Sequence, residues 1–130
     1  MKDILVPLSP GELLDKITIL RIKVARIQDA GKLANVKLEL TLLEQTWRDC
    51  GCAAHDVALD ERALRNVNER LWDIEDRIRD KEAKQTFDRD FIELARAVYR
   101  SNDERAAIKK RINVQLGSRL IEEKSYQQYR

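Results

Sequence analysis

Apolar residues recur at alternating intervals of three and four positions, and this spacing constrains the fold more than any other feature of the sequence. In the first third, the apolar seam consists of Leu13, Ile17, Leu20, Val24 and Ile27. A period near 3.6 places such side chains on one face of an α-helix, whereas a half-buried strand has a period of two. The pattern predicts long amphipathic helices.

The composition favours the same fold class. The 130 residues include only four Gly and two Pro, and 37% are charged. Few turn formers beside many Leu, Ile, Ala, Arg, Lys and Glu are typical of an all-α helical bundle or a coiled coil. We expect a single helical domain over residues 1–130, in which residues 118–130 form a docked or frayed tail.

Capping signals locate the first two helices. Ser9-Pro10-Gly11-Glu12 has the form of a capping box with Pro at the first helical position, so a helix is predicted to start there. The pattern breaks at residues 29–32, where Gly31 is suited to the left-handed conformation that ends helices. A second seam from Leu33 to Cys50 matches the first in length. The two helices are therefore predicted to form a long antiparallel αα-hairpin.

The second half of the chain predicts two or three further helices. A third seam runs from Leu64 to Ile78, and a fourth helix is expected over about residues 86–100. Ser101 or Asn102 is a good N-cap for a fifth helix that Gly117 would stop; one bent helix through Asn102 is the alternative. The total is about five helices. Residues 4–8 could add one short strand, paired with its own copy in a dimer.

The first hairpin carries more apolar surface than one seam. Several of its apolar side chains lie off the main seams, so we expect it to be covered on two sides and to form a homodimer interface. The residues assigned to this interface are Leu14, Ile19, Ile22, Leu38 and Leu42.

Charge and apolar run length restrict the partners. The net charge is only +2, although residues 96–130 hold nine basic and four acidic groups, which favours an anionic small molecule or an acidic protein as partner. Aromatics do not interleave the basic residues, so nucleic acid is not favoured. The longest apolar run, residues 4–8, is far shorter than the roughly 20 residues of a membrane span, and no signal peptide pattern is seen. We expect a cytoplasmic protein.

A Cys-x-Cys-x-x-His cluster is the sharpest local group of candidate ligands. Cys50, Cys52 and His55 are zinc-ligand types, and Asp56 could be a fourth. However, structural zinc sites usually use two separated ligand pairs, and Cys50 continues an apolar seam. We therefore expect no metal and no cofactor. One intervening Gly is too short for an ordinary disulfide, so reduced thiols are expected.

The candidate binding residues are polar side chains that form rows at helical spacing, next to the apolar faces of two predicted helices. Arg105, Lys109 and Asn113 are spaced by four, and Lys16 and Lys23 form a comparable line on the first helix. If the lines converge, they make a basic pocket, and otherwise they are solvated faces. The free amides at the start of the first helix are a weaker candidate for an anion, because Glu12 competes for them. No catalytic motif is found, and no catalytic residue is assigned.

Three blocks carry a family resemblance. They are Ser-Pro-Gly-Glu-Leu-Leu-Asp-Lys (residues 9–16, continuing to 23), Leu-Trp-Asp-Ile-Glu-Asp-Arg-Ile-Arg (71–79) and Asn-Asp-Glu-Arg-Ala-Ala-Ile-Lys-Lys-Arg-Ile-Asn (102–113, continuing through 116–126). Together they resemble a small bacterial family of unknown function. The resemblance implies a helical domain and supplies no activity, but it makes the polar residues of the blocks better site candidates. These are Asp15, Lys16, Lys23, Asn102, Asp103, Arg105, Lys109, Asn113, Glu123, Lys124 and Tyr126.

A looser similarity is to the all-helical chorismate mutases, in which basic residues of a long first helix point into a shared pocket. Lys16, Arg21 and Arg26 would take those parts here. Two hypotheses follow. The first is a self-associating helical binding or scaffold module. The second is a small all-α enzyme or sensor that binds an anionic metabolite in an interhelical basic pocket.

Overall fold

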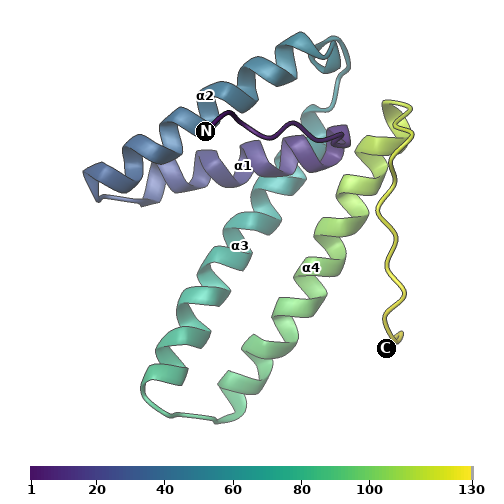
Figure 1. Cartoon of the computed structure of the whole chain (residues 1–130). Helices are drawn as coiled ribbons and strands as arrows, with labels where there is room; N and C mark the ends of the chain where they lie inside the picture. The colour runs from purple at the N-terminus through teal and green to yellow at the C-terminus, as the bar shows by residue number, and fades with distance from the viewer. Residues whose placement is uncertain (130) are drawn as a thin grey trace.

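The protein is built from two helical hairpins that cross (Figure 1). The computed structural model describes residues 1–129, and in them it has four α-helices, one 3-10 turn and no strand. The elements are α1 (Pro10–Arg26), α2 (Ala30–Asp49), η1 (Cys52–Ala54), α3 (Ala58–Ala83) and α4 (Arg89–Gln115). Helix α1 packs across the start of α3 and the end of α4, while α2 lies on its far side. None of these helices contains a stretch long and apolar enough to cross a bilayer.

The predicted start of the first helix is confirmed, and the predicted role of Gly31 is wrong. The Ser9 hydroxyl accepts a hydrogen bond from the Glu12 amide at 3.2 Å. Asp29 caps α2 in the same way, at 2.8 Å from the Lys32 amide. Gly31 therefore lies inside the first turn of α2 instead of ending a helix, because the Asp29 cap begins the new helix before it.

The expected break at Ser101 and Asn102 does not occur, so four helices replace about five. Helix α4 runs through both residues for 27 residues, and Ser101 is buried in it. The segment has no Gly or Pro, and apolar residues on both sides of the expected break are buried on α4, which outweighs local capping preferences. The expected strand at residues 4–8 is also absent. That segment has no regular structure and leaves its apolar side chains largely exposed.

The apolar core lies where α1 crosses α3 and α4. It consists of Leu14, Val57, Leu64, Val67, Ile108 and Ile112. Leu14 and Ile22, expected at a dimer interface, are almost fully buried within the chain, because α3 and α4 cover this face of α1. By contrast, α2 has no buried residue in its 20 positions.

Gly11 sets how closely α1 and α4 approach. Its amide donates a 2.7 Å hydrogen bond to Asn113 Oδ1. A Cβ placed on Gly11 would collide with the backbone carbonyl of Lys109 and would lie 2.8 Å from Asn113 Oδ1. Because a helix backbone cannot move aside as a flexible side chain can, only glycine fits here.

We predict that Gly11→Ala destabilises the protein by about 1–3 kcal/mol, the usual cost of overpacking a tight contact. The matched control is Gly31→Ala, since the nearest atom to a Cβ there is Asp29 Oδ2 at 3.5 Å, an ordinary contact. The control should be neutral or stabilising by up to about 1 kcal/mol, because Ala favours helix over Gly. Urea unfolding of the three proteins measures both changes, and equal stabilities would contradict the close-approach argument.

Candidate functional site

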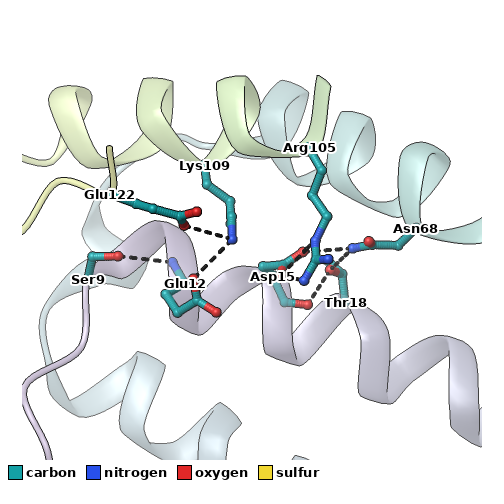
Figure 2. A network of polar contacts seen from close by, with 8 residues as sticks. All are labelled: Ser9, Glu12, Asp15, Thr18, Asn68, Arg105, Lys109 and Glu122. Carbon is teal, nitrogen blue, oxygen red and sulfur yellow. Dashed lines mark hydrogen bonds and ion pairs between the residues drawn. The ribbon is translucent and has the colours of Figure 1, made fainter. Parts of the chain in front are cut away.

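A buried polar network joins α1, α3 and α4 (Figure 2). Asp15 of α1 is fully buried. Arg105 of α4 donates hydrogen bonds to the Asp15 carboxylate, with Nε 3.0 Å from both oxygens and Nη2 bound to Oδ2. Asn68 of α3 donates to Oδ1 at 2.9 Å. The hydrogen bond to Asp15 raises the pKa of Arg105, against the opposing effect of partial burial, so this is a charge-assisted contact across three helices.

Thr18 completes this part of the network. Asn68 Nδ2 also donates to Thr18 Oγ1 at 3.2 Å, and that hydroxyl donates to the Asp15 backbone carbonyl at 2.8 Å. Among the described residues, no buried side-chain nitrogen or oxygen lacks a hydrogen-bond partner. A network satisfied in this way rigidifies the junction, whereas a general acid or base must be open to substrate.

Lys109 forms the second part of the network, one turn further along α4. Its ammonium lies 3.0 Å from Glu12 Oε2 and 3.2 Å from Glu122 Oε2 of the C-terminal tail. Burial lowers the pKa of Lys109, but the hydrogen bond to Glu12 and the charge of Asp15 outweigh it, so the pKa is raised. Glu12 therefore binds Lys109 instead of completing the predicted capping box. Because Asn113 already occupies the Gly11 amide, that donor is not free for an anion.

The C-terminal tail runs back beside α4 (Figure 1). Its Glu123 lies 3.6 Å from Lys110, and the Tyr129 ring packs edge-on against Tyr99 with centroids 5.1 Å apart. A hydrogen bond to Asp103 raises the pKa of the Tyr129 hydroxyl. These contacts place residues 122–129 beside α4 with most of their side chains exposed, while Arg130 lies outside the described residues.

A cavity of about 800 Å³ lies between α4 and this tail. All three tyrosines of the chain, Tyr99, Tyr126 and Tyr129, line it. Its charged lining residues are Asp103, Lys110, Glu122, Glu123 and Lys124. Four of the residues singled out by the family resemblance besides Tyr126 meet here, namely Asn102, Asp103, Glu123 and Lys124. The cavity and the buried network share Glu122, so they form one continuous region.

The structure brings together part of the predicted basic pocket. Arg105, Lys109 and Asn113 meet at the junction, and Tyr126 lines the adjoining cavity. Lys16 is exposed and Lys23 half-buried on α1, and neither forms an ion pair among the described residues. Since Arg105 and Lys109 are paired with carboxylates of this chain, an anion would have to displace those carboxylates to bind.

Arg21 and Arg26, which the similarity to chorismate mutases assigned to a pocket, instead form ion pairs between helices. Arg21 binds Glu44 at 3.1 Å and Glu61 at 2.5 Å. Arg26 binds Asp73 at 2.5 Å and lies over the Trp72 ring. Neither arginine lines the cavity beside the tail. These contacts fasten α1 to α2 and α3.

Sequence reasoning missed Thr18, Asn68 and Glu122. For two of these residues, Thr18 and Asn68, the spacing of residues in the sequence contains a signal. Gly11, Asp15, Thr18 and Ile22 are spaced by 4, 3 and 4, which makes a second seam with small and polar members, and all four are buried. Asn68 stands in an apolar seam between Leu64 and Leu71. A polar residue at a core position of one helix, facing another such residue, indicates a buried hydrogen-bond pair.

The expectation of two reduced cysteines is wrong. Cys50 and Cys52 are joined in a disulfide at the end of α2. Gly51 takes a left-handed conformation, with φ of 79°, and the resulting turn leaves the two Cα atoms 5.4 Å apart, which is within the usual range for a disulfide. Within the part of the chain that the structure describes, no three metal-ligand side chains are grouped to hold a metal ion, so Cys50, Cys52 and His55 do not assemble as a zinc set.

Comparison with known proteins gives one match. The sequence model of a family of unknown function (DUF6165) matches residues 4–129. No curated protein and no solved structure matches the chain.

We predict that Asp15→Ala destabilises the protein by about 3 kcal/mol, because it leaves Arg105 and Asn68 without their shared buried acceptor. The matched control is Asp73→Ala, which breaks the exposed ion pair with Arg26 and should cost less than about 1 kcal/mol. Chemical denaturation measures both. If the two substitutions cost the same, the Asp15 contact is not the organising interaction of the junction.

Proposed function

The chain belongs to this family of unknown function (DUF6165), whose description assigns no activity, and we propose that the protein is a helical binding module that self-associates through α2. One observation carries the proposal. Helix α2 is 20 residues long, contacts α1 and η1, and has no buried residue. A helix covered on one side is expected to present mainly charged and polar residues on its other side, but the exposed surface of α2 also includes a row of apolar residues between Lys37 and Glu39.

The outward face of α2 is a stripe without charge at its centre. Leu38 and Leu42 are 64% and 51% exposed, and Ala34 lies one turn before Leu38. We call these three residues the α2 stripe. Exposed leucines in one row are typical of a surface that packs against another helix.

A second copy of this chain is the occupant that we propose. In a two-fold symmetric contact the same patch meets itself, and the α2 stripe is compatible with this because its centre buries no charge against a like charge.

We predict that the double substitution Leu38→Glu and Leu42→Glu weakens self-association about 100-fold or more, since each leucine buried at an interface contributes about 1.5–3 kcal/mol. Both side chains are exposed in the single chain, so the fold should be retained, unlike for a substitution at buried Ile22. Sedimentation velocity over the micromolar range measures the effect.

The control for this experiment is Leu59→Glu, at a leucine on α3 that is 78% exposed. It should leave the association unchanged. A wild-type protein that remains monomeric throughout the range, or a control that dissociates equally, would refute self-association through α2. A partner of another kind would then have to cover the stripe.

The cavity between α4 and the tail supports a second candidate, the binding of a small ligand that carries a cationic group. The three tyrosine rings offer π faces, and the carboxylates of Asp103, Glu122 and Glu123 outnumber the two lysines of the lining. Lys110 lies 3.6 Å from Glu123, and Lys124 lies over the Tyr126 ring. A cation over an aromatic face beside a carboxylate is a recurring arrangement for ammonium and guanidinium ligands.

We predict that spermidine or arginine amide, at roughly 100 times its Kd, raises the melting temperature by about 10 °C, whereas citrate and inorganic phosphate do not. Tyr126→Leu should abolish the rise and leave the unliganded melting temperature unchanged, because Tyr126 is exposed. A rise with the anions instead would favour the anionic metabolite, and no rise with any ligand would refute binding of this class of cation.

A further inference from the structure

The Cys50–Cys52 disulfide differs from a structural crosslink in two respects. It closes a loop that contains only Gly51, and the stabilisation that a disulfide gains from restricting the unfolded chain is smallest for such short loops. Its two cysteines also differ in environment, since Cys50 is exposed while Cys52 is buried. An exposed cysteine joined to a buried one is suited to exchange, because an incoming thiolate approaches the exposed residue more readily than the buried one.

A second cavity, of about 560 Å³, lies directly beside this disulfide. Both cysteines line it, together with His55, the single histidine of the chain. The rest of its lining is mainly apolar and includes Leu5, Leu8, Leu13, Leu43 and Leu116. A peptide segment with apolar side chains can occupy such a cavity while it presents a group to Cys50.

We propose that Cys50 and Cys52 form a thiol–disulfide exchange site whose substrate is a cysteine thiol in an apolar peptide segment. The disulfide, the exposed position of Cys50 and the apolar cavity beside it carry this proposal together. It is independent of self-association through α2 and of ligand binding beside the tail, because it uses neither the α2 stripe nor the tyrosine cavity.

The exchange proceeds in two balanced steps. The substrate thiolate attacks Cys50 Sγ, a new sulfur–sulfur bond forms, the Cys50–Cys52 bond breaks, and Cys52 leaves as a thiolate that takes up a proton. A second substrate thiolate then attacks the substrate sulfur of this mixed disulfide and releases Cys50, which takes up the second proton. Two substrate thiols are oxidised to one disulfide, and the two electrons reduce the cysteine pair of this chain.

The test uses the full-length protein with two short peptides, one with a cysteine between leucines and one with a cysteine between aspartates. The oxidised wild type should form a mixed disulfide at Cys50 and then become fully reduced, as followed by intact mass spectrometry. The leucine peptide should react about tenfold faster, which corresponds to burial of roughly one apolar side chain in the cavity.

Single variants identify the sulfur that is attacked. With the leucine peptide supplied as its activated disulfide, Cys52→Ser should trap a stable adduct on Cys50, whereas Cys50→Ser should react at least about tenfold more slowly through buried Cys52. Three results would overturn the proposal: a wild type that stays a dithiol under oxidising glutathione, a disulfide that neither peptide reduces, or equal rates for both peptides and both variants.

Discussion

The buried carboxylate of Asp15 is the interaction on which the junction of this protein depends. A charge without solvent is costly unless it is paired and hydrogen-bonded, and Asp15 obtains its partners from two other helices, Arg105 of α4 and Asn68 of α3. Apolar packing alone would tolerate a shift of α4 along α1, because one leucine replaces another at little cost. The Asp15 contact excludes such a shift, since it would leave the carboxylate unpaired.

The alignment of α4 along α1 that pairs Arg105 with Asp15 also aligns the neighbouring contacts between these two helices. On α4, Arg105, Lys109 and Asn113 follow at intervals of one turn, and on α1 their partners Asp15, Glu12 and Gly11 follow in the opposite direction. The close approach at Gly11 is possible because glycine has no Cβ, and its amide then donates a hydrogen bond to Asn113 Oδ1. Part of the excess of basic residues at the end of the sequence has a structural explanation, because Arg105 and Lys109 pair with carboxylates of α1 and Arg111 pairs with Asp60 of α3.

The helices and their faces could be predicted from the sequence, but the assignment of each face to a neighbour could not. Periodicity predicted correctly that α1 is apolar on two sides. It gave no means of telling that α3 and α4 cover Leu14 and Ile22, whereas Leu38 and Leu42 are left exposed by the described residues. The error at Ser101 is of the same kind, because a local cap signal competes with burial that only the folded chain supplies. The sequence did contain a signal for the network, because Asp15 and Thr18 lie at helical spacing in a second seam of α1 that also includes Gly11 and Ile22.

The arrangement also separates the rigid part of the molecule from the parts available for binding. Side chains at the junction are bonded to one another, so they hold the helices and have little capacity left for a ligand. The α2 stripe and exposed Cys50 lie outside this network, whereas the tyrosine cavity shares only Glu122 with it. The tail links the junction to the tyrosine cavity, because Glu122 contacts Lys109 at the junction and also lines that cavity. A ligand that moved the tail would therefore take a carboxylate from Lys109, and binding at the periphery would be coupled to the contact between α1 and α4.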